Sequence, residues 1–554
     1  MLAGERLVSA PENARTPETA PEVLPATCLP TWDVADLPEP EAIRWRHWTR
    51  LIGPGIVMMG VQIGGGEWLF GPEITARYGG GLLWIATVAI VVQVFYNMEC
   101  GRYALYCGEP IFTGFLRTRP GPTFWVIFFL LLSIGAVIPG LASHGGAVLA
   151  AVVLDRPPGE PDRPLVMALA YVCLVAVVVP VLFGGRIYNT LQAVMTTKVF
   201  VVLGFSLAMG LLFVRPENWC NVLSGFLSFG TVPVADVGGG EHVVNAFNHY
   251  LNTGQWPRMA MANIVVLGAF AGYAGGGGLG NSLYSNFVRD KGWGMGSKVG
   301  AIPSAIGGRH VTLSHIGKVF PVTDENMRRW RGWWKYILTD QIIIWAPGCF
   351  VGMALPALMS LEFSPHSSLF TGLGGLEWTQ AVISADGLRH LPSLGPRLAH
   401  VLWLAMLLAG LMVLLPSQMS VVDEVSRRWT DVLWSASGRV RRGLKRGQVK
   451  YIYYSILGVY AAWCVFSMYL FTRYGTPKLM TLIIANLGNV AIGFTSFLIW
   501  RVNCHMLPRA VRPRWYHQAG LLCCGVFYLG IAALVFREKQ LPILLDLWRR
   551  VSSL

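Results

Sequence analysis

Apolar stretches of about 20 residues recur along almost the whole chain, and they constrain its fold more than any other feature. Each stretch is long enough to cross a bilayer as one helix, in which the backbone groups are hydrogen-bonded within the segment. The 554-residue chain is 53% apolar and only 13% charged, which is too little charge to solvate a soluble protein of this size. The sequence therefore predicts an all-α integral membrane protein.

We predict eleven transmembrane helices from these stretches. They begin near Leu51, Gly80, Thr123, Pro164, Leu191, Met259, Trp334, Arg397, Tyr451, Lys478 and Gln518. Basic residues concentrate in alternate loops, and the loop after the eighth span, RVRRGLKRGQVK, carries six cations and no acid. Because loops rich in Lys and Arg remain cytoplasmic, we expect a cytoplasmic N-terminus and an extracytoplasmic C-terminus in a bacterial inner (plasma) membrane.

The two ends of the chain differ from its apolar body. Residues 1–42 are rich in Pro, Glu and Ala and hold little to bury, so we expect a disordered cytoplasmic tail. Residues 43–537 form the predicted transmembrane domain, and residues 538–554 resemble an amphipathic surface segment. The net charge of +14 follows the loops as membrane orientation requires. We therefore expect the lipid bilayer, and no nucleic acid, as a partner.

Glycine runs interrupt the first and sixth predicted spans, as IGGGEW and YAGGGGLGNSLY. Glycine costs about 1 kcal/mol per residue inside a helix, so both spans should unwind at these runs. Close helix packing is an alternative use of glycine. Unwound backbone at mid-membrane is tolerated only where it lines a cavity or is packed within protein. Two such breaks, five spans apart, predict an inverted repeat of helices 1–5 and 6–10 with the substrate between the breaks.

The predicted substrate site consists of residues at and beside the two breaks. A carboxylate in the membrane core is costly, so we take Glu67, which follows the first glycine run, to be functional. The full set is Gln62, Gly64, Gly65, Gly66, Glu67, Gly277, Gly278, Leu279, Gly280 and Asn281.

The segment GPGIVMMGVQIGGGEW, Gly53 to Trp68, resembles the first helix of the Nramp family of divalent-metal transporters. In that family Gly-Pro-Gly precedes an Asp-Pro-Gly-Asn break at the same distance. VVQVFYNMECGRYALYCGEPIFTGFL, at the end of the second span, is similar to the family's segment there. The resemblance covers most of the chain from Gly53 to Phe536 and implies the LeuT fold.

The chain departs from the family at the residues that would bind the ion. Gly64 stands in place of the family's Asp, and Glu67 in place of its Asn. In the sixth span Leu279, Gly280 and Asn281 replace Met-Pro-His, so the soft thioether that helps to select transition metals is missing. The family's acidic residues on the third span are missing as well.

These changes leave two kinds of substrate open. In one, Glu67 and Asn281 are metal ligands, and Gln62 and freed carbonyls add hard oxygens that suit Mg²⁺ or Mn²⁺ rather than Fe²⁺. In the other, glycine amides at the half-helix starts bind a small oxyanion such as bicarbonate, and Glu67 is protonated or caps its own helix. With no Lys or Arg near the breaks in sequence, we favour secondary-active transport of a divalent cation.

A coupling proton would require titratable groups along the pathway. His144 on the third span is one candidate, because its usual pKa lies near working pH. Glu73 is the second, although pairing with Arg77 four residues later is an alternative. We expect Lys198 on the fifth span to lie near the cytoplasmic surface and to snorkel.

Other classes of protein fit the sequence less well. Intramembrane hydrolases need paired aspartates, a Ser–His set or an HExxH helix, and the spans contain none of these. We therefore expect no enzymatic activity and no cofactor. A channel would use the same breaks, and saturation and counterflow distinguish a carrier from it.

Overall fold

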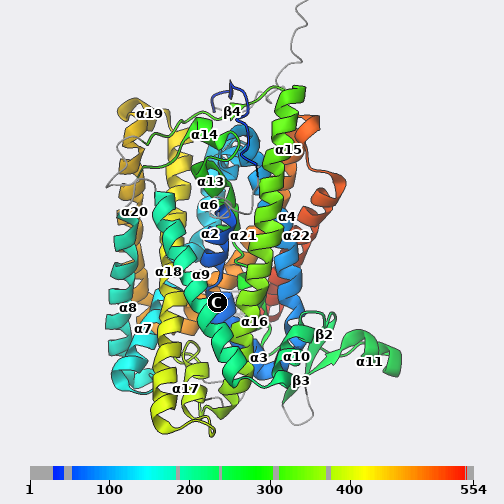
Figure 1. The fold of residues 1–554 in the computed structure, drawn as a ribbon, viewed down its shortest axis with the longest axis vertical. Coiled ribbons are helices and arrows are strands. Elements are labelled where there is room, and N and C mark those ends of the chain that lie inside the picture. Colours follow the sequence, from blue (N-terminus) through cyan, green and yellow to red (C-terminus); the bar gives the residue numbers. More distant parts are fainter. Residues whose placement is uncertain are drawn as a thin grey trace, which may run out of the picture.

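The computed structural model describes residues 29–42, 53–182, 187–235, 240–303, 311–369, 376–542 and 545. Within these residues, nine helices are long and apolar enough to cross a membrane, and they stand side by side in one bundle (Figure 1). They correspond to the predicted spans two to five and seven to eleven. The first and sixth spans fall short of this length because each is interrupted.

The helices follow the predicted order. The first half comprises α2 (Pro54–Gln62), α3 (Gly71–Tyr78), α4 (Trp84–Cys107), α5 (Ile111–Leu116), α6 (Pro122–Leu132), α7 (Gly140–Leu154), α8 (Arg163–Val178) and α9 (Ile187–Phe213). The second half comprises α12 (Ile264–Tyr273), α13 (Leu283–Lys291), α14 (Gly296–Val299), α15 (Asp324–Leu338), α16 (Ala346–Phe363), α17 (Ile383–Arg389), α18 (Pro396–Ala436), α19 (Gly438–Gly443), α20 (Val449–Tyr474) and α21 (Pro477–Met506), before α22 (Trp515–Val535).

The first and sixth spans are each built from two half-helices, as the glycine runs predict. In the first, α2 ends at Gln62, and helical structure resumes in the π-helix η2 (Gly66–Phe70), which continues into α3. In the sixth, α12 ends at Tyr273, and Gly275–Gly278 follow with φ of +75°, +113°, +70° and +63°. Glycine alone adopts these values readily, so this run fixes where the sixth span unwinds.

The third span is also interrupted, which we did not predict. α6 ends at Leu132, a 3-10 turn covers Ile134–Val137, and α7 begins only at Gly140. Pro139 directly precedes α7, and proline cannot continue a helix through itself because it lacks the N–H and clashes with the preceding turn.

Two spans begin away from their predicted starts. α15 begins at Asp324, ahead of the predicted Trp334, because the side chain of Thr323 caps it by accepting a hydrogen bond from Asn326 N at 3.2 Å. α12 begins after the predicted Met259, because Met259 forms a β-bridge with Val234 instead.

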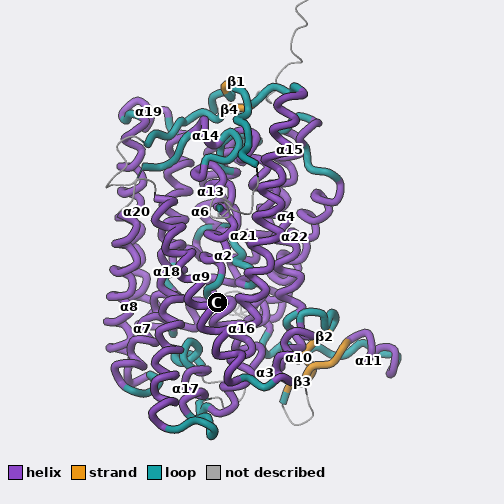
Figure 2. Tube along the Cα trace, in the orientation of Figure 1, coloured by secondary structure: helices purple, strands orange, loops and turns teal. Residues whose placement is uncertain are grey.

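A small extramembrane unit connects the fifth and sixth spans. It contains α10 (Pro216–Gly225), an antiparallel hairpin of β2 (Thr231–Ala235) and β3 (Glu241–Asn245), and α11 (Ala246–Thr253). Figures 1 and 2 show α11 projecting sideways from the bundle.

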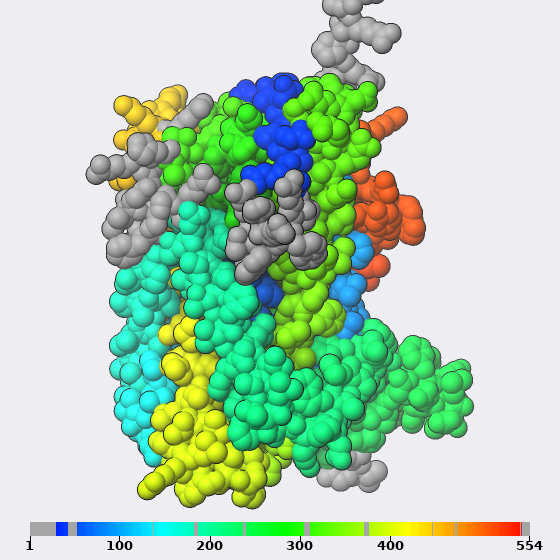
Figure 3. Space-filling view, in the orientation of Figure 1, coloured from blue at the N-terminus to red at the C-terminus, as the bar shows by residue number. Residues whose placement is uncertain are grey.

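Residues 29–42 are packed rather than disordered. β1 (Asp33–Val34) pairs in parallel with β4 (Lys318–Val319), Leu37 is fully buried, and Trp333 Nε1 donates to Pro38 O at 2.8 Å. Figure 3 shows this segment, in dark blue, on the end of the bundle where α15 begins. The predicted tail is therefore wrong for this stretch, because its apolar side chains and backbone find partners there. Residues 1–28, and most of the predicted segment 538–554, lie outside the described residues.

Candidate functional site

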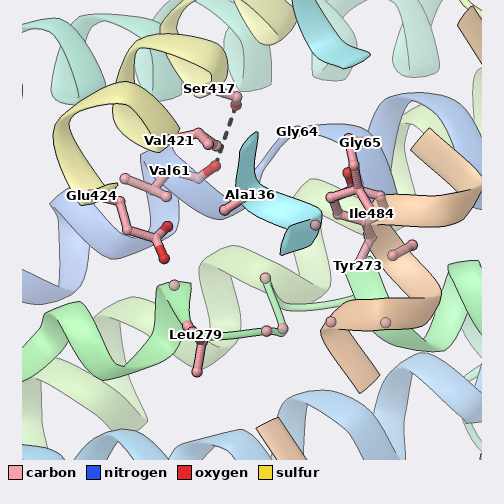
Figure 4. A pocket seen from close by; sticks show the side chains of 18 of the residues that line it. Val61, Gly64, Gly65, Ala136, Tyr273, Leu279, Ser417, Val421, Glu424 and Ile484 are labelled. Atoms are coloured by element: carbon pink, nitrogen blue, oxygen red, sulfur yellow. Dashed lines mark hydrogen bonds between the residues drawn. The ribbon is translucent and has the colours of Figure 1, made fainter. Parts of the chain in front are cut away.

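A cavity of ≈ 120 Å³ lies where the breaks of the first, third and sixth spans meet α18 and α21. Figure 4 shows this cavity with residues of these elements around it. Most of the residues predicted for the substrate site line it, namely Gln62, Gly64, Gly65, Gly277, Gly278, Leu279, Gly280 and Asn281. The remaining two, Gly66 and Glu67, lie elsewhere.

Gly66 and Glu67 lie in the contact between the two broken helices. A Cβ on Gly66 would be 2.6 Å from Tyr273 O, so the two backbones touch at this position. Glu67 is fully buried, and its Oε2 accepts from Gly64 N at 3.0 Å while its Oε1 accepts from Gly275 N at 3.3 Å. The carboxylate therefore binds one amide from each break instead of facing the cavity, and this geometry does not favour the predicted role of Glu67 as a metal ligand.

Asn281 lines the cavity and carries a buried amide oxygen that has no partner among the described residues. Its side chain is fully buried, and its Nδ2 donates to Gln93 Oε1 at 2.7 Å and to Asn97 Oδ1 at 3.0 Å. Within the described part of the chain, its Oδ1 has no hydrogen-bond partner. Both hydrogens of the amide are thus bonded, and the oxygen is the one polar atom of this side chain left without a partner there.

The carboxylate at the cavity belongs to Glu424 on α18. One of its oxygens, Oε1, pairs with Arg428 one turn later, and Oε2 would be 3.2 Å from a Cβ on Gly280. Figure 4 shows the carboxylate between Val61 and Leu279. We did not predict this residue, although SQMSVVDEVSRRWTD places acids and bases in an otherwise apolar span, which is the signal of a functional position.

Cationic side chains lie beside both breaks, contrary to the prediction. Lys198 on α9 is fully buried, and its Nζ donates to Ser417 Oγ at 2.5 Å, so it does not snorkel. α9 crosses α2 closely here, since a Cβ on Gly60 of α2 would be 2.6 Å from Met195 Cβ of α9. This close crossing brings Lys198 to the first break. At the sixth span, Arg428 Nη2 donates to Leu279 O at 3.2 Å.

The two predicted proton carriers belong to one buried cluster outside the cavity wall. His144 Nε2 lies 3.2 Å from Gln380 Oε1, and Gln380 Nε2 donates to Glu73 Oε2 at 2.8 Å. Glu73 also pairs with Arg77 at 2.9 Å and with Lys478 at 2.7 Å. The structure thus connects His144 to Glu73 through Gln380, and the proton route itself stays a prediction.

The described residues contain no group of three or more His, Cys, Asp or Glu side chains placed to hold a metal ion. A cation in the cavity would therefore depend on one carboxylate, an amide oxygen and backbone carbonyls. Hard cations accept such neutral oxygens and retain part of their water shell.

No family model matches the sequence, and no curated protein matches it. The structure does resemble solved structures. A manganese transporter from Eremococcus coleocola, in complex with an aromatic bis-isothiourea substituted compound, matches with a TM-score of 0.57 at 14% identity, over 94% of this chain and 96% of that chain. Two structures of mutants of that transporter match with a TM-score of 0.55 at 14% identity, over 92% and 91% of the two chains.

The protein has a membrane-transporter fold. Together with the apolar helices, this likeness identifies an integral membrane protein. At 14% identity it carries the fold and leaves the substrate to the chemistry of the site.

Proposed function

We propose that the protein is a secondary-active transporter of a divalent metal cation, distantly related to the Nramp family, and that the ion binds in the cavity between the broken helices. The observation that carries this proposal is the oxygen of Asn281. Asn281 is fully buried and lines the cavity, both hydrogens of its amide are bonded to other side chains, and within the described residues its oxygen has no partner. A buried acceptor without a partner costs free energy unless a ligand satisfies it.

The other ligands are hard oxygens as well. Glu424 contributes the negative charge, and carbonyls of the unwound segment Gly276–Gly280 contribute neutral oxygens. Among the described residues, the cavity wall contains no Met, Cys or His, so it lacks the soft ligands that favour late transition metals. This donor set suits Mg²⁺ or Mn²⁺, and the manganese transporter of the same fold supports a metal ion as substrate.

A small oxyanion such as bicarbonate is the second candidate substrate, and the nearby positive charges of Lys198 and Arg428 favour an anion. To bind there, the anion would have to accept hydrogen bonds from the backbone amides at the breaks. The amides of Gly64 and Gly275 already donate to Glu67, and Gly277 N donates to Gln93 Oε1 at 3.3 Å. Because a carboxylate of the protein itself occupies the anion position, the cation is the better substrate.

Calorimetry with Mn²⁺ and Mg²⁺ on purified protein, together with Mn²⁺ uptake into proteoliposomes, tests the proposal. We expect saturable binding and counterflow by the wild type, and binding at least about tenfold weaker in Glu424→Gln. The matched control is Glu362→Gln, since Glu362 is a buried carboxylate outside the cavity wall, and its partner Arg215 is largely exposed. It should bind like the wild type.

Glu424→Gln leaves Arg428 without its carboxylate, so monodisperse elution must be checked first. If that variant does not fold, Asn281→Ala provides the same test without removing a charge. Unchanged Mn²⁺ binding in folded Glu424→Gln and Asn281→Ala would contradict the site. Bicarbonate uptake by a wild type that binds no cation would contradict the substrate.

A further inference from the structure

The ammonium group of Lys198 lies at the seam where α9 and α18 meet the carbonyl end of α2. Its Nζ donates to Ser417 Oγ at 2.5 Å, and Ser417 Oγ lies 3.2 Å from Val61 O and 3.4 Å from Ile63 O. One hydroxyl thus connects the lysine to the carbonyls at the first break. Because the carboxyl end of a helix carries about half a negative charge, this place favours a cation.

No carboxylate of the described residues forms an ion pair with Lys198, and Ser417 is its single hydrogen-bond partner there. The acid whose charge acts on it is Glu67, which already binds two backbone amides. A buried cation without a bonded carboxylate costs several kcal/mol in a membrane, so it is retained for a functional reason.

Other titratable groups near this seam have partners of their own. Among the elements packed against α9, α18 contributes Glu424, which pairs with Arg428, and α13 contributes Asp290, which pairs with Arg427. α16 contributes Cys349, and α2 has no titratable residue. Lys198 is thus the one titratable group among these described residues that joins α9 and α18 to the first break.

We propose that Lys198 is the proton-binding site that couples ion transport to a proton gradient. In the state shown, the ammonium holds α9 and α18 against the carbonyl end of α2. When Nζ gives one proton to water, the charge is lost and α2 is released. When the amine takes one proton from water on the other side, the link forms again. This inference rests on the proposed cation transport and adds its coupling site.

The cluster of His144 and Glu73 is the other location for a proton. Its carboxylate is compensated by Arg77 and Lys478, and both ring nitrogens of His144 have partners. It also lies outside the cavity wall, whereas Lys198 binds Ser417, which is part of that wall.

Proteoliposomes containing wild type, Lys198→Met, Lys478→Met and His144→Gln allow these locations to be compared. Mn²⁺ binding is measured by calorimetry, and Mn²⁺ exchange at equal concentrations on both sides measures transport without a driving force. Accumulation is then measured with a one-unit pH gradient while the membrane potential is held at zero. Lys478→Met is the matched control, because it removes a second buried ammonium that is paired with Glu73.

We expect the wild type to accumulate Mn²⁺ up to about tenfold, the limit for one proton per ion across one pH unit. Lys198→Met should still bind and exchange Mn²⁺ but should accumulate none, while Lys478→Met and His144→Gln accumulate it like the wild type. If Lys198→Met does not fold, Lys198→Arg provides the test, since its permanent charge keeps the link and should block accumulation.

Accumulation at the wild-type level in Lys198→Met or Lys198→Arg would overturn the inference. Loss of accumulation in His144→Gln alone would also overturn it, because that result would locate the proton in the cluster of His144 and Glu73. These results leave cation transport intact, because binding and exchange are measured separately. Absence of binding and exchange in the wild type would instead remove the proposed function, and this inference with it.

Discussion

Glu67 Oε1 in the first span accepts a hydrogen bond from Gly275 N in the sixth span at 3.3 Å. This bond joins the start of η2 directly to the unwound segment of the sixth span. The other oxygen of Glu67 binds Gly64 N, and the residue lies in the first turn of η2, where a negative charge complements the helix dipole. Glu67 therefore connects the two breaks through its carboxylate instead of facing the cavity.

The two hydrogen bonds accepted by Glu67 lead to a prediction for Glu67→Gln. Glutamine retains one carbonyl oxygen but presents an NH₂ group to the second amide, so one of the two bonds is lost. We expect the free energy of unfolding to fall by about 1–3 kcal/mol, with Mn²⁺ affinity changing less than in Glu424→Gln. Thermal unfolding in detergent and calorimetry measure both. Lost Mn²⁺ binding with unchanged melting would make Glu67 an ion ligand, as the sequence alone suggested.

Arg428 pairs with Glu424, so at the proposed site it would compete with the ion for that carboxylate. Replacing it by Met in Arg428→Met removes that positive charge and retains much of the volume packed against Phe112. We expect Mn²⁺ affinity to rise on the order of tenfold. Calorimetry on the folded variant checks this, and unchanged or weaker binding would contradict competition between Arg428 and the ion.

The sixth break depends on glycine at Gly277. A Cβ there would be 1.8 Å from Gly272 O, and the φ of +70° is strained for any other residue. We expect Gly277→Ala to abolish Mn²⁺ uptake and to lower the melting temperature. Gly458→Ala is the control, because a Cβ at Gly458 meets nothing within 4 Å. Wild-type uptake by Gly277→Ala would show that the unwound geometry is unnecessary.

More of the fold than of the candidate site can be predicted from the sequence. Apolar length and glycine runs are local signals, so the sequence predicts both broken helices. It does not predict the interruption before Pro139, because the apolar run continues through it. The site depends on which side chains meet across the bundle, and spacing along one helix does not reveal this. Glu424 and Lys198 lie on α18 and α9, far in sequence from the glycine runs whose cavity and break they approach.

Residues 29–42 are a second case in which the structure depends on contacts between residues far apart in the sequence. Their composition is typical of disorder, but Leu37 is buried by contacts with α15, nearly 300 positions later. We expect Leu37→Ala to destabilise the protein by about 2–3 kcal/mol, since it leaves a cavity in a packed contact. Glu39→Gln should cost under about 1 kcal/mol, because Glu39 is 53% exposed in its pair with Arg329. Thermal unfolding of both variants tests this, and equal melting temperatures would contradict the packing of the segment.

Anomalous diffraction from crystals grown with Mn²⁺ measures directly where the ion binds. We expect a peak in the cavity between the two breaks, bonded to Asn281 Oδ1, with Glu424 as its nearest carboxylate. A peak at Glu67, or a manganese-loaded protein whose only peaks lie outside this cavity, would contradict the site.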